Sequence, residues 1–411
     1  MKTIADHLSP AQAWERMAAC PQLPIATIPL ENALDHCLAQ EFLALEDVPA
    51  SDRSFMDGFA VRAEDLAEIP ARVKLIGEIL MGEVSDQQLS SHETMAIPTG
   101  GYLPAGADAV VMQEDTEVSE NSVVIKRILQ KGENVQSRGE DFLRGDRMFP
   151  AGHRLRPQDL SAIATFGNPA VSVYKKPRLG IISTGNELVP YDQNLAPPGK
   201  IRETNALALA GAAGKFGFES HRLGIIRDEF AAQRAALQEA IDSFDVVLVS
   251  GGSSVGERDF TLQVIESFED ARIHFHGLAI RPGNPTIFAS IGSRFVFGLP
   301  GQPVSSLIVF YQFVLPFLFH LSGENIHYEY FHSTQLKTRY AFLGKSVRRL
   351  KLRTDYVRLR LEPSGSRLKA FPVPGKSASL STLAMADGYC IVSPGEDRIP
   401  EDAEIKVILF P

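Results

Sequence analysis

The stretch FDVVLVSGGSSVGERDF, residues 244–260, decides the fold class of the chain. A run of strand-forming residues ends abruptly at two glycines, and two serines, a third glycine and acidic residues follow. Because glycine has no Cβ, such a turn lets backbone N–H groups approach an anion, and the serines and a following helix add donors. A tight turn without a ligand explains the glycines alone equally well. The candidate anion-binding residues are Gly251, Gly252, Ser253, Ser254 and Gly256.

Strand and helix patterns alternate on both sides of this stretch. Each of three strand patterns is followed by a helix pattern, in the order 176–184, 203–217, 221–228, 229–242, 244–250 and 260–269. This alternation predicts a three-layer α/β fold with a largely parallel sheet. A predicted hairpin around the glycine of IGS, residues 291–293, then leads into an apolar helix at 303–321.

The remaining sequence predicts β-rich regions around this α/β domain. Short strand-like runs alternate with glycine and proline turns from residue 70 to 155, and again after residue 330. A helix beginning at Pro10 with Ser9 as its N-cap precedes them, and helical spacing returns at 151–167. We therefore expect an α/β multidomain protein with four domains: a small mixed domain of 1–46 and 145–176, an inserted β-rich domain of 47–144, an α/β domain of 177–328, and a C-terminal β domain of 329–411.

The composition narrows the class of protein. A net charge of −9 argues against a general nucleic-acid binder, because nothing global attracts phosphate backbones. The three cysteines lie far apart, which fits a reducing compartment better than a disulfide scaffold. The N-terminus has no signal-peptide core, and the apolar segment 303–321 contains Gln312 and Pro316, which indicates a buried helix rather than a membrane span. We expect a cytoplasmic protein that does not associate with a membrane.

Acidic residues follow the predicted strands at the same edge of the sheet. Ligands bind beyond the carboxyl ends of the strands in open parallel sheets, so Glu187, Asp228 and Asp259 are expected to face one crevice. Converging carboxylates repel, and Mg²⁺ between them would relieve that cost while bridging to phosphate. We expect Asp228 and Asp259 to hold the metal. Taken singly, both also fit helix caps.

Other segments are weaker candidates. Arg281, in a proline-glycine loop, could grip an oxyanion or lie on a rigid turn. The basic run 345–360 has the alternation of a solvated strand face. His274 and His276 lack a third ligand and are interpreted as packing residues. The sequence contains no GxSxG elbow, Walker loop or GxGxxG motif, which removes the common hydrolase, P-loop and dinucleotide-binding classes.

Seven motifs in order resemble the molybdopterin molybdenumtransferases, the MoeA and gephyrin E-domain family. They are SFMDGFA (54–60), PTGG (98–101), SRGEDF (137–142), PAGHRL (150–155), STGNEL (183–188), GGSSVGERDF (251–260) and GLPGQPVS (298–305). The resemblance covers nearly the whole chain. It implies a molybdopterin-binding α/β domain, a β-barrel-like C-terminal domain, and an enzyme of molybdenum cofactor synthesis.

The resemblance also implies the reaction and its residues. Such an enzyme inserts molybdate into adenylylated molybdopterin, releases AMP with the help of Mg²⁺, and works as a homodimer whose site lies between subunits. A molybdopterin adenylyltransferase could hand over its product directly. The catalytic residues implied are Asp57, Thr99, Asp141, Glu187, Asp228 and Asp259. The substrate-binding residues implied, besides the glycine-serine turn, are Arg281, Pro300, Pro303, Ser305, Arg353 and Ser377.

The chain departs from the family pattern at five positions: Asn186, Glu203, Thr204, Asn284 and Gln302. Asn284 replaces a lysine, and the loss of a charged hydrogen bond costs about 1.5–3 kcal/mol. These departures favour one alternative, a diverged non-catalytic paralogue or scaffold that binds the pterin nucleotide or tungstate. A second alternative is the molybdopterin adenylyltransferase reaction, against which the two additional β-rich regions argue. The four aspartates Asp57, Asp141, Asp228 and Asp259 favour the enzyme.

Overall fold

The chain forms two compact units. The computed structural model describes residues 7–251, 260–328, 331 and 335–411. Unit 1 consists of Met1–Ala39, Gly152–Arg156 and Ala170–Pro411, and unit 2 of Gln40–Ala151 and Pro157–Pro169. Unit 2 is thus built from segments inserted within the sequence of unit 1. The predicted division into four domains stays a prediction.

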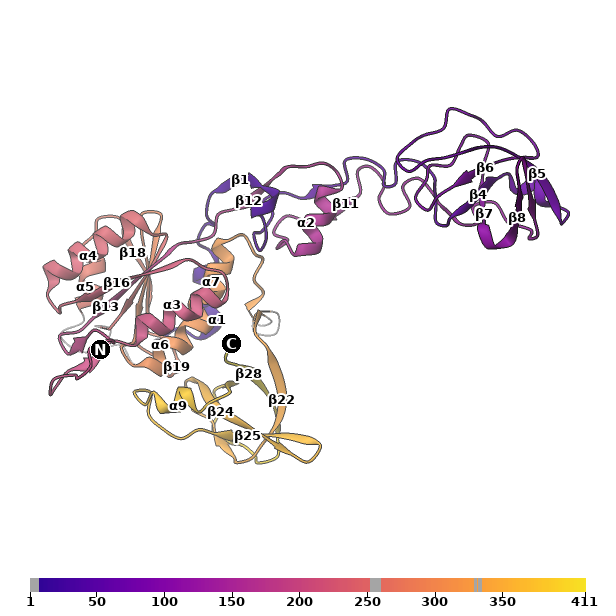
Figure 1. Ribbon diagram of the computed structural model, residues 1–411. Helices are drawn as coiled ribbons and strands as arrows, with labels where there is room; N and C mark the ends of the chain where they lie inside the picture. The colour runs from indigo at the N-terminus through magenta and orange to yellow at the C-terminus, as the bar shows by residue number, and fades with distance from the viewer. Residues whose placement is uncertain (1–6, 252–259, 329–330, 332–334) are drawn as a thin grey trace. The chain divides into compact units, whose positions relative to one another are not determined.

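A six-stranded sheet lies at the centre of unit 1 (Figure 1). In spatial order its strands are β16 (Ser220–Ile226), β13 (Leu179–Thr184), β17 (Val246–Ser250), β21 (Arg294–Leu299), β20 (Ile287–Ile291) and β18 (Ala271–His276). The first four strands are parallel, whereas β20 pairs antiparallel with both of its neighbours. The prediction of a largely parallel sheet ending in a hairpin is therefore confirmed.

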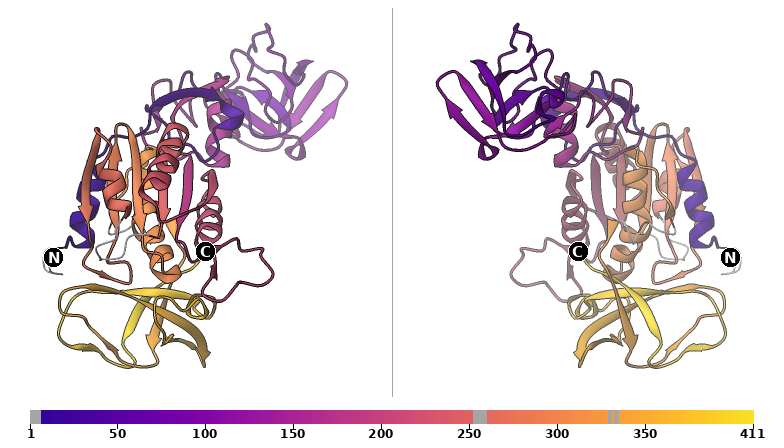
Figure 2. Two further views of the ribbon diagram at one scale, coloured as in Figure 1. Left: turned by 90° about the vertical axis from the view of Figure 1, so that its left-hand side faces the viewer. Right: turned by 90° about the vertical axis from the view of Figure 1, so that its right-hand side faces the viewer.

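Helices cover both faces of this sheet because its strands are apolar on both sides. Val246 and Leu248 of β17 join one buried cluster, and Val247 and Val249 join another, since successive strand residues point to opposite faces. The first cluster includes α1 (Pro10–Ala18), α3 (Asn205–Lys215), α6 (Pro303–Val309) and α7 (Leu315–Leu321). The second includes α4 (Phe230–Ser243) and α5 (Phe260–Glu266). Figures 1 and 2 show the resulting three layers.

The first helix begins as predicted. The Ser9 hydroxyl accepts a hydrogen bond from the Gln12 N–H, and the Gln12 side chain accepts one from the Ser9 N–H, which completes a capping box ahead of Pro10. Trp14 packs into the first buried cluster and stacks on Tyr328 with ring centroids 5.4 Å apart. The helix therefore holds the N-terminal segment against the α/β core.

The apolar segment Pro303–Leu321 is a core helix. It is long and apolar enough to cross a membrane by length and composition, but 89% of its apolar window is buried inside the protein. A π-helical turn at Phe310–Val314 joins α6 to α7 and contains Gln312, which is fully buried. The Gln312 amide donates to the Tyr389 hydroxyl at 2.6 Å, so the polar residue in this helix has a partner. The prediction of a buried helix is confirmed.

The C-terminal part of unit 1 is a closed five-stranded barrel. Its strands are β24 (Thr354–Ser364), β25 (Arg367–Pro372), β22 (Thr338–Leu343), β28 (Glu404–Leu409) and β26 (Gly388–Val392), and β26 pairs with β24 to close the ring. Its interior is apolar and includes Leu343, Leu359, Ala370 and Val407. The barrel-like expectation is confirmed.

Two residues of the α/β domain extend the sheet of the barrel. β19 (Ile280–Arg281) runs parallel to the start of β24, with Arg281 opposite Asp355. The Arg281 guanidinium forms a two-pronged ion pair with Asp355, with the Nε atom 3.1 Å from the carboxylate. The Asp355 side chain is only 4% exposed, whereas that of Arg281 is 52% exposed. The α/β domain and the barrel are therefore joined by backbone pairing and by a charged contact.

Unit 2 contains a second six-stranded sheet. Its strands lie in the order β7 (Ala109–Met112), β4 (Gly58–Val61), β6 (Glu93–Ile97), β5 (Ala71–Glu78), β9 (Ser122–Ile125) and β8 (Thr116–Ser119). Two short pairs, β2 (Phe42–Leu43) with β11 (Arg147–Phe149) and β3 (Arg53–Ser54) with β10 (Val135–Gln136), accompany it, as does α2 (Pro157–Ala164). The β-rich character expected for this region is confirmed.

We predict that Arg281→Met destabilises unit 1 by about 2–4 kcal/mol, because it leaves the buried Asp355 carboxylate without its counter-ion. The double variant Arg281→Met/Asp355→Leu should regain much of that loss, since no buried charge remains. Differential scanning calorimetry of both variants measures the difference. A single variant as stable as the unmodified protein would show that Asp355 does not depend on Arg281.

Candidate active site

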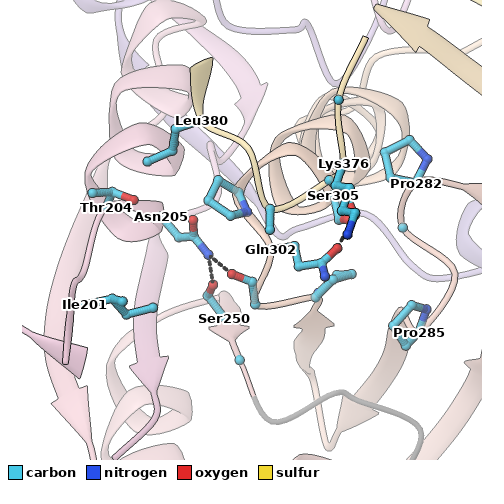
Figure 3. A pocket seen from close by; sticks show the side chains of 18 of the residues that line it. Ile201, Thr204, Asn205, Ser250, Pro282, Pro285, Gln302, Ser305, Lys376 and Leu380 are labelled. Carbon is cyan, nitrogen blue, oxygen red and sulfur yellow. Dashed lines mark hydrogen bonds between the residues drawn. The ribbon is translucent and has the colours of Figure 1, made fainter. Parts of the chain in front are cut away.

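A cavity of about 1520 Å³ lies at the carboxyl ends of the parallel strands of unit 1. Strand ends provide its floor, with Ser183, Thr184, Ser250 and Gly251 among the lining residues. The loops 187–205, 280–285 and 300–305 form the α/β walls, and the barrel contributes residues from 353–358 and 373–380. Figure 3 shows side chains from these segments around one space. The crevice predicted for an open α/β sheet is thus closed on one side by the barrel.

The cavity is strongly cationic for a chain with a net charge of −9. Among the described residues that line it, three are acidic, Glu187, Glu203 and Asp355, and six are basic: Lys200, Arg202, Arg281, Arg353, Arg358 and Lys376. Six positive and three negative charges leave a net charge of +3. Such a concentration of positive charge attracts an anionic ligand.

The start of the predicted anion-binding turn lies on the cavity floor. Gly251 has a φ of 109°, and a Cβ there would lie 2.3 Å from the Thr184 carbonyl oxygen, so no other residue fits without a shift. The Gly251 N–H donates to the Leu299 carbonyl at 3.2 Å. Gly252, Ser253, Ser254, Gly256 and Asp259 lie outside the described residues, so their predicted roles stay predictions.

Asn205, at the start of α3, ties two of the cavity loops together. Its side-chain amide donates to the Ser250 hydroxyl and to the Gly301 carbonyl, both at 2.9 Å (Figure 3). Thr204, the residue before it, also lines the cavity. Glu203, one of the departures from the family pattern, is 7% exposed and accepts a hydrogen bond from the Ala206 N–H at 2.8 Å. Its carboxylate therefore caps α3.

The two described strand-end acids differ in their positions. Glu187 lines the cavity, whereas Asp228 is not one of its lining residues. The Asp228 carboxylate accepts from the Asn186 N–H at 3.1 Å and from the Gln233 amide at 3.3 Å. In return the Asn186 side-chain oxygen accepts from the Asp228 N–H at 3.3 Å. The Asp228 carboxylate therefore joins two loops at the strand ends, and its predicted catalytic and metal-binding role stays a prediction.

These carboxylates nevertheless have the chemistry that Mg²⁺ prefers. Magnesium uses oxygen ligands and is commonly bound through one or two carboxylates plus phosphates and water. Each Asp228 oxygen accepts one hydrogen bond from a described residue and keeps a free lone pair, and no described group bonds the Glu187 carboxylate. The described residues contain no cluster of three His, Cys, Asp or Glu side chains that could hold a metal. Glu187 and Asp228 fit a magnesium ion that is also held by substrate.

The other predicted binding residues of unit 1 meet at the cavity. Arg281, Pro300, Pro303, Ser305, Arg353 and Ser377 all line it. The Arg281 guanidinium is engaged with Asp355, and the Ser377 hydroxyl is hydrogen-bonded to the Gln302 side chain. Gln302, another departure from the family pattern, therefore connects a loop of the α/β domain to the barrel.

The side-chain NH₂ group of Asn284, a residue that lines the cavity, is engaged within unit 1. The group donates to the Leu278 carbonyl at 2.7 Å and contacts His7 Nδ1 at 2.8 Å. Because a carbonyl oxygen can only accept, the NH₂ group must point toward Leu278, and both of its hydrogens are used. Asn284 therefore supplies neither a positive charge nor a free donor to an anion.

The remaining predicted catalytic residues lie in unit 2. The Asp57 carboxylate accepts from the Thr99 N–H at 2.7 Å and from the Thr99 hydroxyl at 2.9 Å. The backbone bond and then the hydroxyl bond hold the pKa of Asp57 below its ordinary value of 3.8. The Asp141 carboxylate accepts a hydrogen bond from the side-chain amide of Gln136 at 3.3 Å. Gln136 lies on β10, which pairs with β3, the strand before the Asp57 loop. Unit 2 thus brings Asp57 and Thr99 into contact, and Asp141 contacts the adjoining strand pair through Gln136.

Sequence reasoning missed several residues of the cavity. Asn205, Lys200, Arg202, Asp355, Arg358 and Lys376 were not singled out as site residues. A signal existed for Arg358, since the basic run 345–360 is unusual in an acidic chain. That run was interpreted as a solvated face, but Arg353 and Arg358 line the cavity. Asn205 gave no signal, because its partners are distant in sequence.

The fold and the cavity define the class of protein: a multidomain α/β protein with a cavity rich in basic side chains between a parallel sheet and a barrel. Three family models match the chain: the MoeA N-terminal region (domain I and II) over residues 8–167, a probable molybdopterin binding domain over 180–320, and the MoeA C-terminal region (domain IV) over 340–410. The chain belongs to the MoeA family.

Relatives match over most of the chain. The molybdopterin molybdenumtransferase of Bacillus subtilis is 36% identical over 392 residues, covering 93% of this chain and 89% of the relative. That of Haemophilus influenzae is 34% identical and covers 74% and 75%. A crystal structure of the molybdopterin biosynthesis MoeA protein from Pyrococcus horikoshii has a TM-score of 0.83 and 32% identity, covering 99% of this chain and 100% of the other.

We predict that Thr99→Ala raises the pKa of Asp57 toward 3.8, because one of its two donors is lost while the backbone N–H remains. Since the folded pKa is depressed, the stabilisation is present above the unfolded pKa and is lost as the pH falls through the lower, folded pKa. Carboxyl-detected NMR titration measures the pKa. Thr99→Ser, which keeps a hydroxyl, should leave it low; an unchanged pKa in Thr99→Ala would contradict the contact.

We predict that Asn284→Asp lowers the free energy of unfolding of unit 1 by about 1–3 kcal/mol, because a carboxylate cannot donate to the Leu278 carbonyl and would repel it. Urea denaturation measures the change. Asn194→Asp adds the same charge at an exposed position of the same unit and should be nearly neutral. Equal stabilities of the two variants would show that the Asn284 amide is not needed.

Proposed function

We propose that the chain is a molybdopterin molybdenumtransferase, which inserts molybdate into adenylylated molybdopterin and releases AMP. The observation that carries the proposal is the cavity with a net charge of +3, which the sheet ends and the barrel form in an acidic protein. Both the nucleotide and molybdate are anions, and the relatives named for this activity match over most of the chain.

The cavity offers separate groups for the parts of such a substrate pair. The predicted glycine turn that begins at Gly251 would bring backbone N–H groups close to a phosphate, and Lys200 and Arg202 line the same cavity as Gly251. The barrel side contributes Arg353 and Lys376. Holding the two anions in one cavity makes their reaction effectively unimolecular, which is a large part of the catalytic gain. Positive charge also stabilises AMP as it leaves.

Magnesium belongs to this proposal. Glu187 and Asp228 would hold the ion together with Asp259 and the phosphates of the nucleotide. When bound, Mg²⁺ neutralises the negative charge that builds up on the phosphate oxygens. The hydrogen bonds between Asn186 and Asp228 fix the second carboxylate and keep the two loops together.

The homodimer is a further part of the proposal. Asp57, Thr99 and Asp141 lie on unit 2, and the side chains beside Asp57, Phe55 and Met56, are 47% and 42% exposed. We expect unit 2 of one copy to complete the cavity of a second copy. Apolar side chains next to a hydrogen-bonded carboxylate are suited to a surface that becomes covered on association.

The expected compartment is the cytoplasm. Cys20, Cys37 and Cys390 are buried free thiols, and burial raises their pKa values to about 11, 12 and 12. Buried thiols with raised pKa values are unreactive. A reducing compartment keeps such thiols unpaired. A molybdopterin adenylyltransferase, which makes the nucleotide, is the expected partner for hand-over of the substrate.

The two alternatives are not favoured. A stand-alone adenylyltransferase does not account for family matches over the N-terminal and C-terminal regions. A non-catalytic paralogue was suggested by Asn186, Glu203 and Asn284, but each of these side chains has a structural contact in unit 1. These departures are therefore compatible with an intact site.

We predict that Asp57→Asn and Glu187→Gln each abolish AMP release, while a mixture of the two variants, unfolded and refolded together, recovers about a quarter of the activity of the unmodified protein. Half of the dimers would contain both variants, and each of these would hold one intact site. Molybdate-dependent AMP release from adenylylated molybdopterin is the assay. No recovery would place the whole site in one copy, and no molybdate-dependent release by the unmodified protein would refute the proposed activity.

A further inference from the structure

Lys376 lies on the loop between β25 and α9 (Ser381–Ala384), where the barrel meets the cavity. Figure 3 shows it beside Ser305 and Gln302, which belong to the opposite wall. Its side chain is long and exposed, and such a side chain loses much rotamer entropy when it binds. A lysine at this position binds a ligand well only if its backbone is already held in place.

The residue before Lys376 is held from the barrel side. The Arg358 guanidinium on β24 donates to the Gly375 carbonyl oxygen at 2.9 Å. Gly375 has a φ of 147°, and a Cβ at this position would lie 2.4 Å from Thr382 Cγ2. The loop therefore makes a close turn that requires glycine, and Arg358 pins it immediately before the lysine.

The residue after Lys376 is held from the α/β side. The Ser377 hydroxyl is hydrogen-bonded to the Gln302 side chain, and the Val304 N–H donates to the Ser377 carbonyl at 3.3 Å. Gln302 and Val304 flank Pro303, at the start of the core helix. Lys376 is thus the residue between two anchors, one from each wall of the cavity.

Most other cations of the cavity are already engaged. Arg281 pairs with Asp355, Arg202 donates to the carbonyls of Gln193 and Asn194, and the Lys200 ammonium donates to the Asn186 carbonyl. By contrast, no residue in the described part of the chain bonds the Lys376 ammonium or the Arg353 guanidinium. The Asn284 side chain, which also lines the cavity, has no free donor. The available positive charge is therefore concentrated on the barrel wall.

We propose that Lys376 binds a tetrahedral oxyanion of the substrate pair, and that Arg358 is a positioning residue that acts through the Gly375 carbonyl. This inference rests on the proposed function, in which the oxyanion is either molybdate or a phosphate group of the nucleotide. Both are tetrahedral groups with anionic oxygen acceptors, molybdate with two negative charges and each bridged phosphate with one, and an ammonium group with three donors suits either. The positive charge that position 284 lacks is then supplied from the other wall.

Steady-state kinetics of AMP release by the full chain tests this inference. Lys376→Met should raise the KM for the oxyanion by at least about tenfold, as expected for the loss of a charged hydrogen bond, while kcat at saturation stays within about twofold. A rise in the KM for molybdate identifies free molybdate as the ligand, and a rise in the KM for the nucleotide identifies its phosphate. Lys376→Arg should recover most of the loss because it keeps the charge.

Controls separate this inference from the proposed function. Lys345→Met removes a lysine of the barrel that does not line the cavity, and should change neither KM. Equilibrium dialysis with tungstate gives a readout of free-oxyanion binding that does not depend on turnover. If the unmodified protein releases AMP in response to molybdate and Lys376→Met leaves both KM values unchanged, the assignment of Lys376 is wrong and the proposed function stands.

The positioning role of Arg358 has its own test. Arg358→Met should raise the same KM as Lys376→Met, and should add little in the double variant, because it acts through the lysine. Two independent contacts would instead multiply their effects. A multiplied effect would overturn the positioning role, as would an unchanged KM in Arg358→Met.

Discussion

The cavity exists because two residues of the α/β domain pair with a strand of the barrel. β19 is too short to form a stable strand alone, yet it pairs with β24 and places Arg281 against the buried Asp355. Gln312 in the core helix adds a second link through Tyr389 of the barrel. Tyr356 and Tyr389 belong to the same buried cluster as the core helix, so the barrel and the α/β domain share one hydrophobic core. Without these contacts the strand ends would open onto solvent, and the basic residues of the barrel would no longer face them.

The placement of charge follows from this arrangement. Three of the six basic residues of the cavity, Arg353, Arg358 and Lys376, come from the barrel, and three come from the α/β loops. The three cations of the α/β loops bond backbone carbonyls or Asp355. They therefore hold the cavity wall together and also contribute positive electrostatic potential. Of the barrel cations, Arg358 is bonded to the Gly375 carbonyl, whereas Arg353 and Lys376 have no bonding partner among the described residues. An anion that contacts both walls of the cavity would therefore strengthen the contact between the two parts.

The sequence was most informative where periodicity is strong. The alternation of strands and helices from 176 to 269 predicted the parallel sheet and its layers, and the apolar run 303–321 predicted a core helix. Family motifs pointed to Gly251, Arg281, Ser305 and Ser377, which do meet at the cavity. The sequence did not indicate the long-range contacts. Nothing in it pairs the Asp228 carboxylate with Asn186, 42 positions away. No local pattern marks Asn205 or Lys376. Asn205 bonds Ser250, 45 positions away, and the loop of Lys376 is held by the contact between Ser377 and Gln302, 75 positions apart.

The only tryptophan of the chain has a consequence for how the protein can be observed. Trp14 lies in unit 1, stacked on Tyr328 inside the cluster that the barrel and the α/β domain share. Its ring is 8% exposed, so its emission depends on the integrity of that cluster. Unit 2 contains no tryptophan. Intrinsic fluorescence at the red edge of absorption therefore reports the α/β core alone, and the chain carries a built-in optical label that distinguishes one unit from the other.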